Sequence, residues 1–287
     1  MRSGFVAVAG RPNVGKSTLV NALTGAKVAI VSDKPHTTRH EIRGVYTDDA
    51  AQLVLVDLPG WQKPIDMLTE RMQGRVDDAV TSDVDAVLLV VNAREHIGTG
   101  DRFVARRVFG LGIPVVIVLN KVDRLKPGHI ATQMKTAAEL GAFHALHPVS
   151  AKTGDGIGEL RGDLVSLLPD GPLYYPPGTD TDMPLEARIA ELVREQALRL
   201  TKEEVPHAVT AEVVEIDDKR VHVRLYTETE SQKQILIGKG GTMVREIGRG
   251  ARPHVEALLG HPVFLQLQVK TSPKWRRNET MLERLGL

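Results

Sequence analysis

The octapeptide Gly10-Arg-Pro-Asn-Val-Gly-Lys-Ser17 stands between an apolar run, residues 5–9, and a helix-length segment, residues 16–23. It fits the pattern G-x-x-x-x-G-K-[ST], in which backbone N–H groups of a glycine-rich loop surround a phosphate chain at a helix N-terminus. The lysine is expected to reach the β- and γ-phosphates of a nucleoside triphosphate, and the serine to bind Mg²⁺. A glycine-rich turn without a ligand is the alternative. Four specified positions, together with their place between a strand and a helix, argue against it. The residues predicted to bind phosphate are Gly10, Arg11, Pro12, Asn13, Val14, Gly15, Lys16, Ser17 and Thr18.

Around this loop, up to about residue 169, short apolar runs alternate with helix-length segments. The runs are nearly continuous in apolar residues, as in parallel strands covered on both faces, and they occupy residues 5–9, 52–56, 86–91, 115–119 and 144–149. Helices are expected at residues 16–23, 69–81, 102–111 and 157–168. Residues 41–47 alternate and are polar, so we expect an antiparallel edge strand there. The pattern predicts an α/β domain with a doubly wound, mostly parallel sheet.

The base of the nucleotide is indicated by Asn120-Lys-Val-Asp123, which follows the run 115–119 at the carboxyl edge where such sheets bind ligands. The Asp123 carboxylate can accept hydrogen bonds from the N1–H and N2–H of guanine. Adenine lacks both donors and would leave the carboxylate desolvated and unpaired. Ser150-Ala-Lys152 can offer backbone N–H groups to the guanine O6. Asn-Lys-x-Asp alone is a common exposed turn, but its order and spacing behind the phosphate loop favour a guanine site. That site comprises Asn120, Lys121, Asp123, Ser150, Ala151 and Lys152.

Two further segments, residues 35–41 and 58–66, are predicted to be loops that order with the γ-phosphate. Asp57-Leu-Pro-Gly60 ends a strand, so Asp57 can hold Mg²⁺, through water, and the Gly60 N–H can contact the γ-phosphate. Of the two neighbouring threonines, Thr38 is favoured over Thr37 to complete the Mg²⁺ shell with Ser17 and Asp57. A β-turn at the Pro-Gly pair and capping by the threonines are the alternatives. The predicted switch or catalytic residues are Thr37, Thr38, Asp57, Pro59 and Gly60.

Together these motifs resemble the translation-factor-like class of P-loop GTPases over residues 3–168. The spellings Gly-Arg-Pro-Asn-Val-Gly-Lys-Ser, Thr-Thr-Arg and Asp-x-Pro-Gly resemble the Era family in particular. Many small GTPases carry a water-orienting glutamine straight after the Asp-x-x-Gly segment, whereas this chain has Trp61 there and Gln62 one position later. The resemblance therefore implies slow intrinsic hydrolysis, with a K⁺ ion at Asn13 neutralising transition-state charge as an arginine finger does elsewhere. Loop shaping by Asn13 is the alternative. Arg11 and Arg39 are expected to be structural or switch residues rather than fingers.

Residues 169–184 hold five prolines and two glycines and are predicted to be a semi-extended linker. Beyond them, residues 185–200 have helical spacing, with Leu185, Ile189, Leu192, Val193 and Leu200 on one face and Glu and Arg on the other. Strands at 208–216 and 220–226, helices at 231–236 and 242–259, and a strand at 263–269 complete the order α-β-β-α-α-β. The predicted domains are residues 1–168, a linker at 169–184, and residues 185–287.

Gly238-Lys-Gly-Gly241 has the G-x-x-G spacing, which chance alone supplies in a chain with 26 glycines. Its place between two helices and after a strand hairpin resembles a type II KH domain, in which this loop clamps the backbone of four single-stranded nucleotides. Basic residues flank the loop and follow the last strand, and a solvated charged face is the alternative for them. The predicted RNA-binding residues are Ile237, Gly238, Lys239, Gly240, Gly241, Arg245, Lys270, Trp275 and Arg276.

With this half included, the resemblance to the Era family covers nearly the whole chain. It implies a GTP-hydrolysing switch that binds small-subunit ribosomal RNA near its 3′ end and assists 30S subunit assembly, with GTP and GDP as substrate and product, Mg²⁺ and K⁺. A second hypothesis is a signalling GTPase whose second domain docks a protein or membrane surface. A third, an ATP-dependent kinase, requires Asn120 and Asp123 to be accidental.

The composition excludes several other classes of protein and site. The 287 residues carry a net charge of +1, so any RNA-binding surface must be local. The chain has no cysteine, which excludes disulfides, thiolate zinc sites and cysteine nucleophiles. No apolar run approaches the roughly 20 residues of a spanning helix, and the first residues show no signal-peptide hydrophobic region. We expect a cytoplasmic monomer, with peripheral binding to the inner face of the membrane left open by its basic patches.

Overall fold

The computed structural model describes residues 1–34, 36–61, 64–81 and 84–287, and its chain contacts divide into two compact units. Unit 1 comprises Met1–Ala29, Thr38–Pro64 and Arg71–Asp182. Unit 2 comprises Ile30–Thr37, Ile65–Glu70 and Met183–Leu287. Two short segments that flank the nucleotide-binding motifs therefore belong to the unit that contains the C-terminal third of the chain. Each unit is described by itself.

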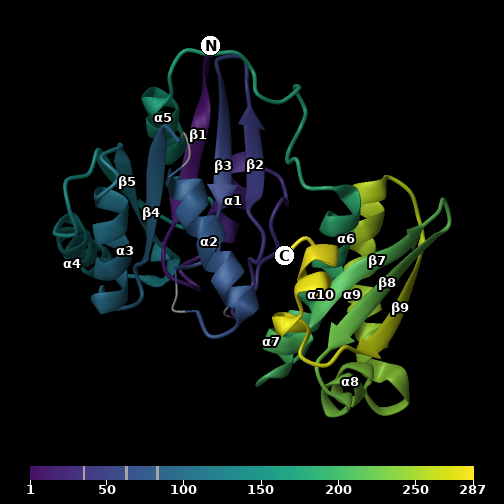
Figure 1. The fold of residues 1–287 in the computed structure, drawn as a ribbon. Helices are drawn as coiled ribbons and strands as arrows, with labels where there is room; N and C mark the ends of the chain where they lie inside the picture. The colour runs from purple at the N-terminus through teal and green to yellow at the C-terminus, as the bar shows by residue number, and fades with distance from the viewer. Residues whose placement is uncertain (35, 62–63, 82–83) are drawn as a thin grey trace. The chain divides into compact units, whose positions relative to one another are not determined.

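Unit 1 is built on a six-stranded sheet in the order β2-β3-β1-β4-β5-β6 (Figure 1). Its strands are β1 (Arg2–Ala9), β2 (Ile42–Thr47), β3 (Ala51–Asp57), β4 (Ala86–Asn92), β5 (Val115–Asn120) and β6 (Ala145–Val149). All neighbouring strands run parallel except β2, which pairs antiparallel with β3 at the edge. The predicted α/β class and the antiparallel edge strand are both confirmed.

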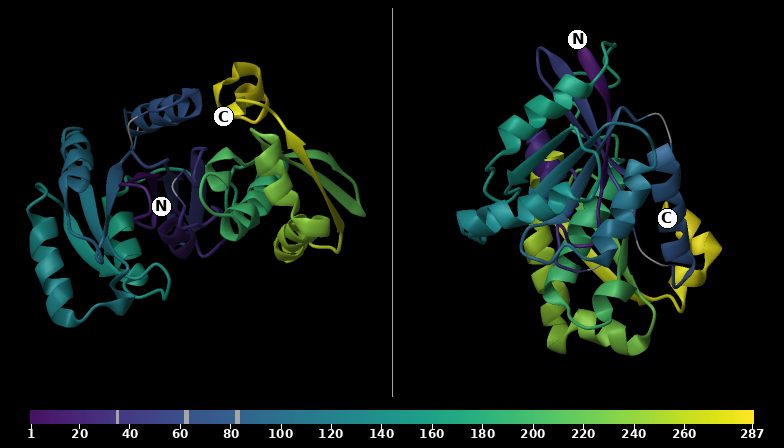
Figure 2. Two further views of the ribbon diagram at one scale, coloured as in Figure 1. Left: turned by 90° about the horizontal axis from the view of Figure 1, so that it is seen from below. Right: turned by 90° about the vertical axis from the view of Figure 1, so that its left-hand side faces the viewer.

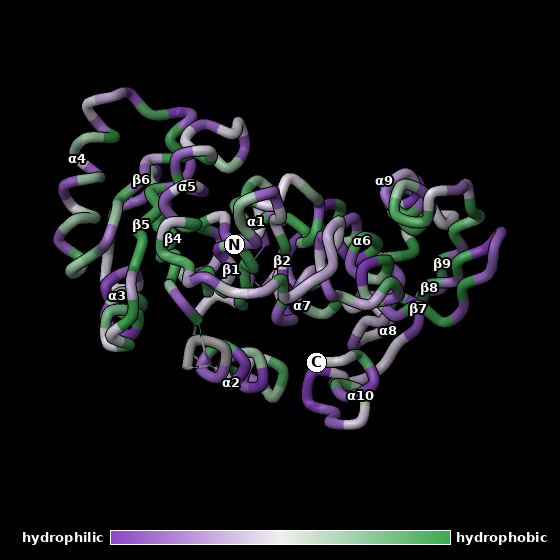
Figure 3. The backbone as a smooth tube through the Cα atoms, turned by 90° about the horizontal axis from the view of Figure 1, so that it is seen from above, coloured by the Kyte–Doolittle hydropathy of each residue, from purple (hydrophilic) through white to green (hydrophobic). Residues whose placement is uncertain are grey.

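Helices cover both faces of this sheet. They are α1 (Lys16–Thr24), α2 (Met67–Thr81, shared with unit 2), α3 (Thr99–Phe109), α4 (Pro127–Ala138) and α5 (Ile157–Leu167). Residues of α2, α3 and α4 join one hydrophobic cluster with the sheet, whereas α1 and α5 contact each other and the strands β1 and β3. Figure 2 shows helices on either side of the sheet. Because both faces are covered, β3 and β4 are buried along their whole length, and Figure 3 shows the central strands as mostly apolar.

The proline-rich segment, predicted to be a semi-extended linker, packs along unit 1. Residues up to Asp182 belong to unit 1, and isolated bridges pair Asp170 with Arg2 and Thr181 with Gly44. The buried side chain of Gln52 accepts hydrogen bonds from the backbone of residues 174 and 175 (2.7 and 3.0 Å) and donates one to the carbonyl of residue 175 (2.9 Å). Prolines hold this stretch extended, so it lies along the sheet and satisfies a buried amide there. The domain bounds 1–168, 169–184 and 185–287 stay a prediction.

Unit 2 carries a three-stranded sheet in the order β7-β8-β9, with β7 and β8 antiparallel and β8 and β9 parallel. The elements are α6 (Leu185–Leu200), α7 (Val205–Ala208), β7 (Thr210–Ile216), β8 (Arg220–Thr227), α8 (Glu230–Ile237), α9 (Thr242–Leu259), β9 (Phe264–Thr271) and α10 (Glu279–Arg284). Helices α6 and α9 pack on each other, α6 packs against β7, and α9 and α8 pack against β9. The order α-β-β-α-α-β appears as predicted, with α7 and α10 added. In the described part of the chain, no helix is both long and apolar enough to cross a membrane.

Helix α6 departs from the predicted amphipathic pattern. Leu185 and Leu200, at its two ends, are 39% and 40% exposed, whereas the polar residues Glu191, Arg194 and Glu195 are buried. The polar face that the pattern predicted is thus largely buried. The physical reason is that Glu195 and Arg194 bind main-chain groups of Val31 and Thr37, and Glu191 binds Arg194.

Candidate nucleotide site and nucleic-acid groove

The phosphate loop begins at the end of β1 and passes into α1, so its main chain curls in front of the helix N-terminus. The Lys16 ammonium lies inside this curl and donates to the carbonyl oxygens of Gly10 (3.2 Å) and Arg11 (3.0 Å). Burial lowers the pKa of Lys16 to about 8, against the opposing effect of the nearby Asp57 charge. A phosphate is a stronger acceptor than a neutral carbonyl, so this buried cation is suited to bind one.

Three oxygen-bearing side chains meet beside Lys16. The Ser17 hydroxyl donates to Asp57 Oδ2 (2.6 Å), and the hydroxyl oxygens of Ser17 and Thr38 lie 2.9 Å apart. Burial raises the pKa of Asp57 to about 6, against the lowering effects of Lys16 and of the two hydroxyls. In contrast, the Thr37 hydroxyl donates to the carbonyl of Lys34 (2.7 Å), so the geometry supports Thr38 rather than Thr37 as the metal-shell threonine.

The same three side chains fit Mg²⁺. The Asp57 Oδ1 atom is buried and, within the part of the chain that the structure describes, has no hydrogen-bond partner. Mg²⁺ prefers oxygen ligands and is commonly held by one or two protein side chains together with substrate phosphates. Among the described residues no group of three or more His, Cys, Asp or Glu side chains could hold a metal by itself. The site thus suits an ion that arrives with a nucleotide.

The loop after β3 approaches the phosphate loop closely. A Cβ atom added to Gly60 would lie 2.7 Å from the backbone nitrogen of Pro12, so glycine is required at this position. The main chain just after Pro59 therefore lies close to the phosphate loop. The next side chain, Trp61, is 7% exposed, packs in the hydrophobic cluster of unit 1 and donates through Nε1 to Asp77 (3.2 Å). It therefore cannot orient a water molecule. The predicted switch residues Pro35, Gln62 and Lys63 lie outside the described residues.

Asn120 ties the guanine motif to the phosphate loop. Its side-chain amide donates to the carbonyl of Val14 (3.0 Å) and accepts from the backbone of Ala151 (3.1 Å) and Lys121 (2.8 Å). The Lys121 ammonium donates to the carbonyl of Asn13 (2.6 Å). These bonds bring three loops, at the ends of β1, β5 and β6, to one edge of the sheet.

Asp123 is placed to read the base. Its carboxylate accepts from the Ser150 hydroxyl (3.1 Å), and its side chain is 17% exposed. Ser150 in turn accepts from the backbone of Thr153 (3.2 Å), which holds the loop that carries Ala151 and the exposed Lys152. A half-buried carboxylate beside backbone N–H groups matches the donor and acceptor edge of guanine.

Arg11 is not available as an arginine finger, because its guanidinium binds Asp101 (2.8 Å) and Glu95 (3.0 Å). Arg39 is 2% exposed. The expectation that these arginines are structural or switch residues rather than fingers stays a prediction.

In unit 2 the G-x-x-G loop joins α8 to α9. Gly238 has φ 73°, and a Cβ atom there would lie 2.7 Å from the backbone nitrogen of Met243. Arg245, one turn into α9, donates to the carbonyls of Gly240 (2.9 Å) and Gly241 (3.1 Å) and so fixes the loop. Lys239 is exposed at the tip. The loop presents its backbone and a positive charge to solvent, as phosphate contact requires.

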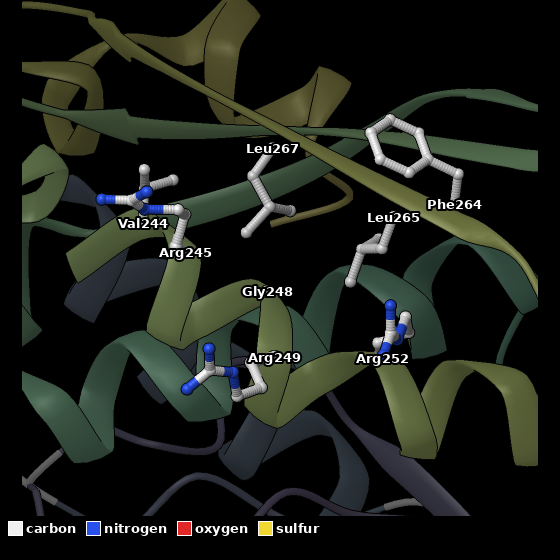
Figure 4. A pocket seen from close by; sticks show the side chains of 8 residues that line it. All are labelled: Val244, Arg245, Gly248, Arg249, Arg252, Phe264, Leu265 and Leu267. Atoms are coloured by element: carbon white, nitrogen blue, oxygen red, sulfur yellow. The ribbon is translucent and has the colours of Figure 1, made fainter. Parts of the chain in front are cut away.

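Beside this loop, α9 and β9 enclose a groove of about 490 Å³ (Figure 4). Arginines follow the helix, and two leucines of the strand point toward it (Figure 4). The lining residues are Val244, Arg245, Gly248, Arg249, Arg252, Phe264, Leu265 and Leu267. The groove thus combines a cationic rim with apolar walls.

Comparisons with known proteins agree with both sites. Residues 5–121 match the family model described as 50S ribosome-binding GTPase, and residues 199–276 match the model of the KH domain. GTPase Era of Mycobacterium tuberculosis (strain ATCC 25618 / H37Rv) is 43% identical over 99% of this chain and 98% of that protein. The chain belongs to the Era family of GTPases. GTPase Era of Mycolicibacterium smegmatis is similar at 42% identity over the same shares.

Solved Era structures match the fold over the full length. A crystal structure of Aquifex aeolicus Era bound to GDP·AlF4⁻ has a TM-score of 0.93 and 35% identity, covering 100% of this chain and 99% of that one. A crystal structure of Era in complex with MgGDPNP and nucleotides 1506–1542 of 16S ribosomal RNA matches with the same values. The predicted resemblance to Era, and the P-loop GTPase domain followed by a KH domain, are confirmed.

In this Era-family chain two predicted RNA-binding residues have partners within unit 2. The Trp275 side chain is 0% exposed and donates through Nε1 to the carbonyl of Ala208 (2.7 Å). The Arg276 guanidinium binds Glu228 (2.6 Å) and Asp66 (3.2 Å). Their contact with RNA stays a prediction. The segment after β9 folds back on its own unit, and a basic composition alone does not reveal this.

Phe264 is the residue that sequence reasoning missed. Its side chain is 65% exposed, and the residue borders the groove with its ring on the side of β9 opposite to Leu265 and Leu267 (Figure 4). The available signal was its position in β9, where Phe264 shares a strand face with Gln266, Gln268 and Lys270, while Leu265, Leu267 and Val269 share the other. An aromatic residue in the polar set of an alternating strand is exposed unless another element covers it.

Proposed function

We propose that this chain is a GTP-dependent switch that binds small-subunit ribosomal RNA near its 3′ end and assists assembly of the small ribosomal subunit. The observation that carries the proposal is the groove beside the G-x-x-G loop, in the same chain as a complete set of guanine-nucleotide motifs. The solved relative that holds both MgGDPNP and a 16S rRNA fragment supports it.

In the nucleotide site, Lys16 would bind the β- and γ-phosphates, and Asp123 with the Ala151 loop would bind guanine. Ser17, Thr38 and Asp57 would hold Mg²⁺, which neutralises phosphate charge when bound. The Ser17–Asp57 hydrogen bond (2.6 Å) already places two of the three ligands together. With Trp61 in the core, hydrolysis depends on charge neutralisation rather than on a water-orienting side chain, and we place a K⁺ ion at Asn13 for this role.

In the groove, RNA phosphates would approach the G-x-x-G backbone and the charges of Lys239 and Arg245. Val244, Leu265 and Leu267 would contact bases from the walls, and the exposed ring of Phe264 offers a surface for stacking. The two remaining arginines of the rim each have a carboxylate nearby, Arg249 with Glu246 (3.1 Å) and Arg252 with Glu256 (3.8 Å). Their positive charge is thus partly balanced, which favours a narrow RNA contact over a broad one.

The test is binding of a labelled oligonucleotide from the 3′ end of small-subunit rRNA, with GDP and with a non-hydrolysable GTP analogue, across a salt titration. The double substitution Lys239→Asp/Gly240→Asp is expected to abolish RNA binding and to leave GTP hydrolysis unchanged, with a small fall in melting temperature because Gly240 has φ 59°. Lys219→Asp, at the exposed β7–β8 turn, is the matched control and should bind like the parent protein.

Equal, salt-sensitive binding to a scrambled oligonucleotide would overturn the rRNA proposal and turn attention to a protein or membrane partner. The cytoplasmic location, the monomeric state and peripheral membrane association stay predictions. Sedimentation analysis and binding to vesicles of anionic phospholipid test the last two.

A further inference from the structure

The chain leaves the GTPase unit and returns to it within a few residues, immediately before the metal-shell threonine. Up to Ala29 it is held in unit 1, where the side chain of Asn21 accepts from the Ala29 backbone (2.9 Å). Residues 30–37 belong to unit 2, and Ile30, 3% exposed, is part of that unit's hydrophobic core. Thr38 is again in unit 1, beside Ser17.

Within unit 2, the buried polar side chains of α6 bind both ends of this segment. The Glu195 carboxylate, whose side chain is 0% exposed, accepts from the Val31 backbone N–H (2.9 Å). The Arg194 guanidinium, 1% exposed, donates to the carbonyl oxygen of Thr37. It is held in place by Glu191, whose two carboxylate oxygens each lie 2.7 Å from an Arg194 nitrogen.

Such a cluster needs an explanation, because burying charged side chains is costly unless they are paired and hydrogen-bonded. Leucine or alanine on this face would pack α6 without that cost. Of the polar groups here, Arg194 and Glu195 each reach a main-chain atom of the segment that precedes Thr38. Hydrogen bonds from charged groups to backbone fix a position more strongly than neutral ones.

We propose that Arg194 and Glu195 are positioning residues for the nucleotide switch. They hold Val31 and Thr37 so that the next residue, Thr38, reaches Ser17 and Asp57, and they join the triphosphate-sensing threonine to α6 of the KH-containing unit. The inference rests on the proposed function for the identity of the nucleotide. It adds the residues through which nucleotide binding and RNA binding are linked.

The linkage follows from thermodynamics. A triphosphate that fixes Thr38 also fixes the Thr37 carbonyl to which Arg194 is bonded, so binding of the nucleotide changes the free energy of α6 and its partners. A ligand on the KH-containing unit must then change the affinity for the triphosphate by the same factor. GDP has no γ-phosphate to order Thr38, so its affinity should not depend on this connection.

The primary test is Arg194→Met, which keeps the length of the side chain and removes its donors. We expect the affinity for a non-hydrolysable GTP analogue with Mg²⁺ to fall about tenfold, while GDP affinity stays within about twofold of the parent protein. We also expect the ratio of RNA affinities with GTP analogue and with GDP to approach one. Arg194→Lys, which retains a donor and a charge, should restore part of the loss.

The matched control is Arg199→Met. Arg199 lies on the same helix and binds the same Glu195 (3.2 Å), but its side chain is 48% exposed and does not bond the segment. It should behave like the parent protein. Glu195→Gln, a nearly isosteric change that weakens the bond to Val31, provides a second variant should Arg194→Met unfold, which the melting temperature reports.

Equal losses for GDP and the GTP analogue, or no loss for either, would overturn the inference, since both results describe a merely structural pair. A parent protein that binds no RNA while Arg194→Met selectively loses the GTP analogue would overturn the proposed RNA function and leave the positioning role standing. The two failures are therefore distinguishable.

Discussion

The hydroxyl of Ser17 donates a 2.6 Å hydrogen bond to the carboxylate of Asp57 at the buried end of β3. The other carboxylate oxygen is buried and unpartnered within the described residues, and burial raises the pKa of Asp57 to about 6. A cation stabilises the charged form of a carboxylate in this environment, because the carboxylate has lost its contact with water. Ser17 and Asp57 are thus placed to bind the metal that accompanies the nucleotide.

The first prediction concerns pH. Asp57 must lose its proton to bind Mg²⁺, and its raised pKa means that protons compete with the metal below about pH 6. Mg²⁺-dependent affinity for a GTP analogue should be highest near pH 7 and fall about tenfold per pH unit below 6. At higher pH it should fall again as Lys16, whose pKa burial lowers to about 8, loses its proton. Fluorescence titrations at fixed Mg²⁺ from pH 5 to 8 measure this.

Asp57→Asn is the control, since an amide has no proton to lose and its weak affinity should not change with pH below 7. The same variant tests the sign of the shift in the absence of nucleotide. A pKa raised on folding stabilises the folded state below pH 4 and loses that contribution as pH rises through 6. Asp57→Asn should therefore be more stable than the parent at pH 7.5 and equal to it at pH 4. A less stable variant at pH 7.5 would contradict the raised pKa.

The strands of unit 1 could be predicted because the sheet is covered on both faces. Every residue of such a strand is buried, and a continuous apolar run such as residues 115–119 indicates this directly. The loops of the nucleotide site could be predicted for a related reason. Phosphate and guanine impose fixed chemistry on short, contiguous stretches such as Gly10–Ser17 and 120–123. Neither inference needs knowledge of distant segments.

The buried polar face of α6 could not be predicted in this way. Arg194 and Glu195 bond backbone atoms of residues 37 and 31, and Glu191 bonds Arg194. Backbone partners leave no trace in the pattern of side chains. The proline-rich stretch is a similar case, since its partners include the buried amide of Gln52 and backbone groups of distant strands. The spacing of apolar and polar residues indicates which face of a helix or strand is buried. It does not indicate which distant backbone segment lies against that face.

Base recognition supplies the second prediction. Asp123→Asn replaces an acceptor with an amide that cannot accept from both guanine donors, so affinity for GTP and GDP should fall about 100-fold or more. The amide can instead donate to the carbonyl that xanthine carries at C2, so affinity for xanthosine triphosphate should rise. Isothermal titration with GTP, ATP and xanthosine triphosphate measures the change. A variant that keeps its GTP affinity would remove Asp123 from the site.

Potassium supplies the third prediction. Trp61 lies in the core and Arg11 is held by Asp101, so neither a glutamine at position 61 nor a cis arginine stabilises the transition state. Hydrolysis in K⁺ should exceed that in Na⁺ by about tenfold. Asn13→Ala should remove the difference between the two salts and leave GDP affinity unchanged. Equal rates in both salts for the parent protein would exclude the ion from this role.

The fourth prediction separates the roles of Phe264 and Trp275 in unit 2. Phe264→Ala should weaken RNA binding by about 1–3 kcal/mol, the value of one stacked base, with little change in melting temperature, because its side chain is largely exposed. Trp275→Phe should leave RNA binding unchanged and lower stability by about 1–3 kcal/mol, because it strands the Ala208 carbonyl that Nε1 satisfies.

Each variant is the control for the other. Phe264→Ala removes an aromatic surface, whereas Trp275→Phe removes a buried hydrogen bond. Urea unfolding and oligonucleotide titration measure the stability and the RNA affinity of both variants. The structure fits only if Phe264→Ala loses RNA affinity alone and Trp275→Phe loses stability alone. Loss of RNA affinity in Trp275→Phe at a temperature where the protein stays folded would show that the segment after β9 contacts RNA. In that event the burial of Trp275 would have to change when RNA binds, and its indole fluorescence would report that change directly.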